Sequence, residues 1–170
     1  EDSVRVGGLL SGQADVIRAV EAQDEAQVRK SGFTIYAPQT NGVNNHLSLR
    51  FRNDVLADIR VRQALIAGID RQELVDVIYT DSYPLATSIL SKGAVGYINT
   101  EDAFTFDAKR AARLLDEAGW LPGADGIREK NGVSLTLVAN ESAAQARSFE
   151  ALTLISQQLA KIGVDLQILK

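Results

Sequence analysis

The chain has 170 residues, of which 45% are hydrophobic and 24% are charged, and its formal net charge is -4. This composition is typical of a globular domain with a real core, and the acidic balance argues against nucleic acid and anionic membranes as partners. The lack of cysteine excludes disulfides, zinc–thiolate sites and thiol catalysis.

No apolar run approaches the roughly 18 residues that a membrane-spanning helix requires. The chain contains no methionine, and its first residues, Glu1-Asp2-Ser3, do not resemble a signal peptide. We therefore expect it to be a piece excised from a longer polypeptide.

The N-terminal part is predicted to combine short helices with strands. Helical patterns that end at Gly12 and Gly32 occupy residues 3–11 and 24–30. Stretches that are β-branched, aromatic or alternating in polarity predict strands at residues 14–20, 33–37 and 46–52. Residues 38–45 are rich in Asn, Gly and Thr and predict a loop.

Two successive helices are predicted in the middle of the chain. The first begins near Asp58, and its apolar positions recur on one helical face at Val61, Ala64, Leu65, Gly68 and Ile69. Asp70 is the predicted N-cap of the second, and Glu73 completes a capping-box pattern. The second helix should bury Leu74, Val77 and Ile78. A long loop follows at 81–105, and loops of this length usually bind something or wrap a neighbour.

The C-terminal part continues the alternation of helix and strand. Asp107 caps a helix that Gly119 ends, and the inward positions of this helix are Ala111, Leu114, Leu115 and Ala118. Asn131-Gly132 predicts the tight turn of a hairpin spanning 126–138. A long amphipathic helix at 143–161 and a closing strand at 164–169 follow. This order predicts an α/β domain.

Three blocks of the sequence, in this order, resemble one bacterial family. They are DIRVRQALIAGIDRQELVDVIY from Asp58, FDAKRAARLLDEAGW from Phe106, and AQARSFEALTLISQQLAKIGVDLQI from Ala144. They are similar to the solute-binding proteins of peptide-type ABC importers, extracellular solute-binding family 5. The resemblance extends from Ser11 to Lys170, although Arg52 departs from the Asn that commonly ends the preceding strand.

The resemblance implies an α/β fold forming one lobe of a two-lobed, clam-type periplasmic binding protein, with a mixed sheet flanked by helices. Residues 1–170 would be a single domain, the C-terminal-side lobe, without the first lobe and the segment after residue 170. The implied function is capture of a peptide or similar small solute and its delivery to an ABC permease in the inner membrane. The protein is expected to be a monomer at the periplasmic or extracellular face of that membrane.

The resemblance also points to a ligand-binding loop between the hairpin and the long helix. Dipeptide-type members carry an arginine in this loop that helps to hold the ligand's carboxylate, whereas residues 140–145 contain none and the nearest is Arg147. A loop that leads into a helix N-terminus still suits a carboxylate, because it presents unpaired N–H groups and a positive dipole end. Glu141 would favour a cationic ligand instead. The candidate ligand-binding residues are Asn140, Glu141, Ser142, Gln145 and Arg147.

Two other classes of function stay open: an α/β hydrolase or transferase domain, and a stand-alone interaction domain that uses the same lobe. Phosphate-loop, nucleophile-elbow and zinc-protease motifs are missing, and one histidine without cysteine leaves few ways to build a nucleophile–base pair. We therefore expect neither catalysis nor a cofactor, and no metal site at His46. Family members bind peptides, nickel complexes, opines and sugars, so the fold does not fix the ligand.

Overall fold

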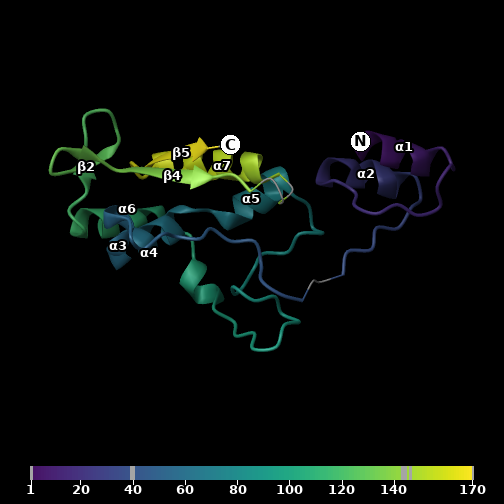
Figure 1. Ribbon diagram of the computed structural model, residues 1–170, viewed down its shortest axis with the longest axis horizontal. Helices are drawn as coiled ribbons and strands as arrows, with labels where there is room; N and C mark the ends of the chain where they lie inside the picture. The colour runs from purple at the N-terminus through teal and green to yellow at the C-terminus, as the bar shows by residue number, and fades with distance from the viewer. Residues whose placement is uncertain (1, 39–40, 143–144, 146, 170) are drawn as a thin grey trace.

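The computed structural model describes residues 2–38, 41–142, 145 and 147–169 (Figure 1). Its helices and strands are, in chain order, α1 (Asp2–Leu10), α2 (Ala22–Lys30), α3 (Asp54–Ala57), α4 (Ile59–Gly68), α5 (Arg71–Ile78), the 3-10 helix η1 (Glu101–Phe104), α6 (Ala108–Glu117), β1 (Leu121–Pro122), β2 (Arg128–Lys130), β3 (Val133–Ser134), β4 (Thr136–Asn140), α7 (Ser148–Ala160) and β5 (Asp165–Leu169). None of the described helices combines the length and the hydrophobicity needed to cross a lipid bilayer.

The main hydrophobic core joins α4, α6 and α7 to the strands. The side chains of Val61, Ala111, Leu115, Leu135 and Val164 are all fully buried in it. The helical spacing predicted these inward faces correctly for α4 and α6. Asp58 and Asp107 accept backbone N–H bonds at the starts of these helices, and the sequence predicted the cap at Asp107.

The strands form two small sheets. Strands β1, β2 and β3 make an antiparallel sheet, and β4 pairs in parallel with β5 through the intervening α7. Asn131 and Gly132 adopt positive φ angles of 54° and 75° at the tip of the predicted hairpin. The α/β class is therefore confirmed, with the parallel and antiparallel pairings in separate sheets.

Helix α5 departs from the prediction on one face. Ile78 is buried, but Val77 is 67% exposed because it lies in an open groove between α5 and α7. Asp70 caps the helix as predicted, accepting from the N–H groups of Gln72 and Glu73. The reciprocal half of the capping box is absent, because the buried Gln158 amide accepts the Asp70 N–H and donates to Glu73 instead.

Helix α7 begins later than predicted. Its first residue is Ser148, and the expected start, Ala143, lies outside the described residues. Arg147 precedes the helix with a left-handed φ of 58°, which breaks the helical run at that point. Gly163 ends this region with a φ of 82°, as the sequence predicted, and β5 follows.

The N-terminal part forms a small unit of its own around Val6, Leu9 and Val28. Figure 1 shows α1 and α2 side by side at one end of the molecule, apart from the main core. The strands predicted at 14–20, 33–37 and 46–52 are wrong. All of these residues are described, and none of them belongs to a sheet. A strand needs a hydrogen-bonded neighbour, and the described residues supply none to these segments.

The long loop at 81–105 is present and is held at several points. The Arg71 guanidinium donates to the carbonyl oxygens of Ala86 (2.6 Å) and Phe104 (3.4 Å). The Asn44 side-chain amide donates to the Ser88 and Leu90 carbonyls, and Val43 forms a β-bridge with Leu90. The loop is therefore fastened both to α5 and to the segment that joins the N-terminal unit to the core.

Candidate functional site

The candidate loop starts at the edge of the parallel sheet. Asn140 is the last residue of β4, pairs with Leu169 of β5, and is followed by Glu141, whose N–H donates to the Leu169 carbonyl (2.8 Å). Both strands therefore end at the same edge, and the chain then turns into α7. In open α/β sheets this carboxyl edge is where ligands commonly bind.

A short hydrogen-bonded turn fixes the loop. The Gln145 N–H donates to the Ser142 carbonyl (2.9 Å), and the buried Ser148 hydroxyl lies 2.9 Å from that carbonyl and 3.2 Å from Oε1 of Glu141. The side chains of Asn140, Ser142 and Gln145 are exposed, whereas Glu141 is half-buried. The first three can therefore meet a solute, and Glu141 can do so only from the side that Ser148 leaves open.

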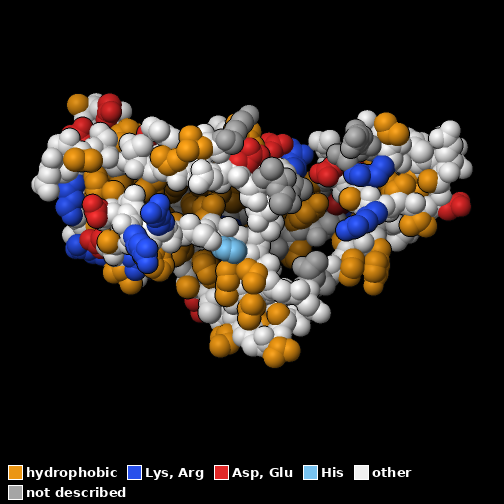
Figure 2. All heavy atoms as spheres, in the orientation of Figure 1, with side chains coloured by type: hydrophobic (Ala, Val, Ile, Leu, Met, Phe, Trp, Pro, Cys, Tyr) orange, Lys and Arg blue, Asp and Glu red, His pale blue; other side chains and the backbone are white. Residues whose placement is uncertain are grey.

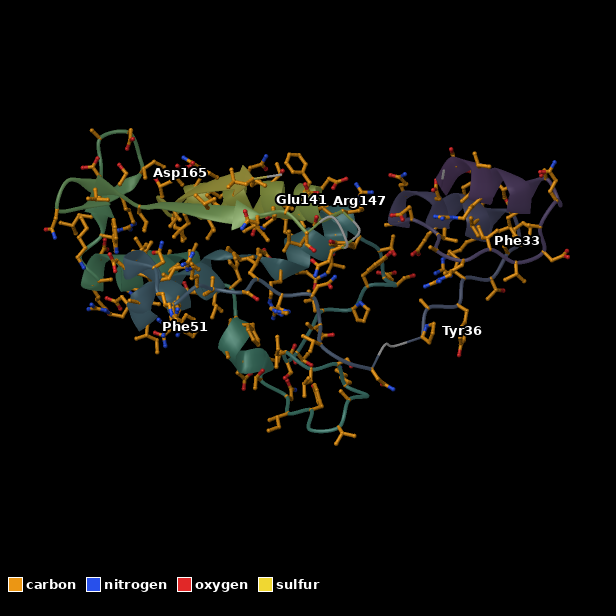
Figure 3. The ribbon with its side chains drawn as sticks, in the orientation of Figure 1. Phe33, Tyr36, Phe51, Glu141, Arg147 and Asp165 are labelled. Carbon is orange, nitrogen blue, oxygen red and sulfur yellow. The ribbon has the colours of Figure 1, made fainter. Side chains whose placement is uncertain are left out.

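Arg147 is directed away from the rest of the loop, toward the N-terminal unit (Figure 3). Its Nη1 donates to Oε1 of Gln23 in α2 (3.2 Å), and its Nη2 lies 3.6 Å from Oε1 of Glu150. Its Nε is buried without a hydrogen-bond partner among the described residues. Arg147 thus retains donor capacity where α2 and α7 meet.

A second polar contact ties α2 to the segment after α5. The Ser82 hydroxyl donates to Oε2 of the buried Glu25 (2.8 Å), and Arg29 donates to the same hydroxyl (3.3 Å). We call this meeting place of α2 with Ser82 and Arg147 the junction.

Two tyrosines stand at the junction. The rings of Tyr79 and Tyr83 lie 5.0 Å apart at a tilt of 38°. Burial raises the pKa of each phenol. The charge of Glu150 raises the pKa of Tyr79 further, and the charge of Glu21 does the same for Tyr83. Arg147 lowers the pKa of both. Both rings therefore remain neutral and can offer an apolar face and a hydroxyl to a solute.

A groove of about 390 Å³ runs from Arg147 between α5 and α7. Its walls combine apolar and polar side chains, namely Val77, Ile78, Phe149, Thr153, Leu154 and Gln157. Arg147 and Glu150 also line the groove, and a largely apolar groove with such a charged pair can accept an amphipathic small molecule.

Sequence reasoning did not find the partners on α2. Gln23 is separated from Arg147 by 124 positions, and Glu25 is separated from Ser82 by 57. Neither residue stands out in the polar sequence of α2, so no local signal could have marked them.

His46 and two aromatic residues, Tyr97 and Trp120, have structural roles. His46 Nδ1 lies 2.9 Å from the Asn44 carbonyl, and the Tyr97 hydroxyl lies 2.6 Å from that of Thr87. Trp120 is buried in the main core. Among the described residues, no group of three or more His, Cys, Asp or Glu side chains is placed to hold a metal ion.

Solved structures similar to this chain include solute-binding proteins. An ABC transporter substrate-binding protein from Sinorhizobium meliloti superposes with a TM-score of 0.79 at 27% identity, over 99% of this chain and 36% of that one. The family described as bacterial extracellular solute-binding proteins, family 5 Middle, matches residues 1–170. The chain therefore belongs to the family 5 solute-binding proteins.

Curated relatives include proteins named for peptide-type ligands. The oligopeptide-binding protein AppA of Bacillus subtilis is 27% identical over 119 residues, covering 68% of this chain and 22% of the relative. The glutathione-binding protein GsiB of Salmonella typhimurium is 24% identical over 168 residues, covering 99% and 30%. The chain thus spans less than a third of the length of these relatives.

Proposed function

We propose that the chain is part of the solute-binding component of an ABC importer, which captures a peptide-like solute between two lobes and delivers it to a membrane permease. The observation that carries this proposal is the match to the family along all 170 residues. The protein acts by binding rather than catalysis, as a monomer at the periplasmic or extracellular face of the inner membrane. These residues supply the C-terminal-side lobe, and the other lobe and the segment after residue 170 complete the cleft.

The loop at residues 140–147 contacts the solute in this proposal. Arg147 has a partly exposed side chain and stands beside the positive end of α7, so its guanidinium is suited to the terminal carboxylate of a peptide. Asn140, Ser142 and Gln145 supply uncharged hydrogen-bonding groups. Glu141 on the same loop suits an ammonium group, so the loop as a whole favours a zwitterionic solute over a simple anion.

Calorimetry on the full-length protein tests this proposal with a short peptide and its C-terminal amide. Arg147→Gln should weaken binding of the free peptide by about 10-fold or more, because a hydrogen bond to a charged group contributes about 1.5–3 kcal/mol. The same substitution should leave binding of the amide nearly unchanged. Arg113→Gln, at an exposed position of α6, is the matched control.

The experiment distinguishes a wrong role for Arg147 from a wrong class of solute. If the free peptide and the amide lose the same affinity in Arg147→Gln, Arg147 does not hold the carboxylate. If the unaltered full-length protein binds no peptide at all, the peptide class itself is wrong.

A further inference from the structure

The groove between α5 and α7 is continuous with the candidate solute loop. Arg147 belongs to both, because it ends the loop and also lines the groove. Its Nη2 lies 3.6 Å from Oε1 of Glu150, which lines the groove as well. Figure 2 shows acidic and basic side chains meeting between the main core and the N-terminal helices, in the region where Figure 3 labels Arg147. A carboxylate held by Arg147 would therefore have the atoms attached to it next to the groove.

The lining of the groove is mostly apolar. Val77 is 67% exposed there, and Phe149 and Leu154 are half-buried. The Thr153 hydroxyl already donates to the Phe149 carbonyl (2.8 Å), so it competes little for the polar groups of a solute. Apolar surface that a solute covers is removed from water, which favours binding in proportion to the area covered. An apolar side chain of the solute is thus the group that this lining stabilises best.

The charges that line the groove discriminate between solutes. The side chain of Arg147 is 24% exposed and that of Glu150 is 50% exposed, so both can face a bound molecule. The guanidinium suits one carboxylate. A second carboxylate on the same solute residue would lie near Glu150 and would be repelled by its charge. The groove therefore suits a terminal carboxylate that is joined to an uncharged side chain.

We propose that this groove holds the side chain of the solute's C-terminal residue and selects a large apolar residue, such as leucine, over alanine or aspartate. The inference rests on the proposed function, in which Arg147 holds the terminal carboxylate. The groove volume of about 390 Å³ lies within the range of small-molecule sites, about 300–1,000 Å³. Because the groove and the loop share Arg147, a single solute residue can engage both.

Calorimetry on the full-length protein with the tripeptides Ala-Ala-Leu, Ala-Ala-Ala and Ala-Ala-Asp tests the proposal. The leucine peptide should bind about 10-fold more tightly than the alanine peptide, which is the low end of the discrimination that an apolar pocket provides, because this groove is open. The aspartate peptide should bind more weakly than the alanine peptide, because Glu150 repels its side chain. Equal affinities for the leucine and alanine peptides would overturn the inference and leave the proposed function intact. If none of the three peptides binds, the proposed function fails and this inference fails with it.

Two substitutions assign the preference to the groove. Val77→Ser should reduce the ratio of the affinities for the leucine and alanine peptides to about 3-fold or less, because it removes exposed apolar lining. Val133→Ser is the matched control and should retain the ratio, since Val133 is 59% exposed in β3 and does not line the groove. Glu150→Gln should bring the affinities for the alanine and aspartate peptides closer together. Both peptides carry the same terminal carboxylate, so a change in how Arg147 is held affects them equally.

The same variants detect a different occupant of the groove. A ratio that stays at about 10-fold in Val77→Ser would place the terminal side chain of the peptide elsewhere. A fall of several degrees in the Tm of unliganded Val77→Ser, without a similar fall in Val133→Ser, would show that another part of the polypeptide already fills the groove. A fall that appears only at high protein concentration would identify a second copy as the occupant. Each of these results rejects the proposal.

Discussion

At the scale of single residues, Arg128 makes more structural contacts than its place in a short strand suggests. Its Nε donates to the Ile162 carbonyl (2.8 Å), and its Nη1 donates to the Trp120 carbonyl (2.7 Å) and to Asp116. A buried guanidinium with these acceptors joins the hairpin sheet to the ends of α6 and α7. Gly163 gives it room, since a Cβ there would lie 2.7 Å from Cγ of Arg128.

Arg128→Ala should lower the free energy of unfolding by about 3 kcal/mol, because it leaves two buried carbonyls without donors. Arg128→Lys should recover only part of this loss, since an ammonium cannot reproduce the spread of the guanidinium donors. Urea denaturation of both variants measures the two values. Equal stability of Arg128→Ala and the parent would show that water replaces the guanidinium at no cost.

Asp58 combines a helix cap with an ion pair. Its carboxylate accepts from the Arg60 backbone N–H (2.9 Å) and lies 2.6 Å from the Arg60 guanidinium. Hydrogen bonding to the Arg60 side chain lowers the pKa of Asp58 to about 2. The folded state therefore prefers the ionised form more strongly than the unfolded chain does.

The consequence is a loss of stability in acid. The contribution of a carboxyl whose pKa is depressed on folding is complete above about pH 4 and disappears as the pH falls toward 2. Asp58→Asn keeps a capping oxygen but removes the charge, so it should cost about 1 kcal/mol at pH 7 and progressively less as the pH falls through the folded pKa of about 2. Thermal melts of both proteins across pH 2–7 should converge at the acid end; a constant difference would exclude the ion pair as its cause.

At the scale of elements, α6 provides a direct test of the core. Leu115 is fully buried, whereas Leu121, just beyond the helix, is 59% exposed. Leu115→Ala should cost about 2–5 kcal/mol of stability through lost burial and the cavity left behind. Leu121→Ala should stay within about 0.5 kcal/mol. Chemical denaturation distinguishes the two, and similar values would mean that the inward face of α6 is misplaced.

The sequence predicted those elements whose signals are local. Apolar spacing marks α4, α5 and α6, the predicted caps Asp70 and Asp107 mark the starts of α5 and α6, and Asn131-Gly132 marks the hairpin turn. The strands predicted in the N-terminal part failed because pairing depends on neighbours that local sequence does not encode. Val77 was wrongly predicted to be buried because the sequence does not show that an open groove separates α5 from α7 at this residue.

The candidate site, too, could be predicted from the sequence only in part. Resemblance predicted a ligand-binding loop at residues 140–145, and the structure places the first residue of that loop, Asn140, at the carboxyl edge of β4 and β5. The contacts of Arg147 with Gln23 and of Ser82 with Glu25 join distant parts of the chain. No pattern within a short window specifies such pairs, so they could only come from the fold.

At the scale of the whole molecule, the described residues provide a loop and an open groove rather than an enclosed pocket. Asn140, Ser142 and Gln145 are all exposed, and Arg147 is shared with Gln23 and Glu150. Small-molecule sites normally bury about 70–90% of their ligand. In the two-lobed receptor proposed above, a single lobe would leave the solute's other face in water, where each hydrogen bond contributes only about 0.5–1.5 kcal/mol.

The 170-residue chain alone should therefore bind peptides no more tightly than about millimolar, or roughly -4 kcal/mol. The full-length protein should bind far more tightly, because closure of two lobes stabilises the state in which the solute bridges them. Calorimetry on both proteins with the same peptide makes the comparison, and circular dichroism confirms that the shorter chain is folded. Micromolar binding by the 170 residues alone would show that these helices and strands already contain a complete pocket and that closure is not what holds the solute.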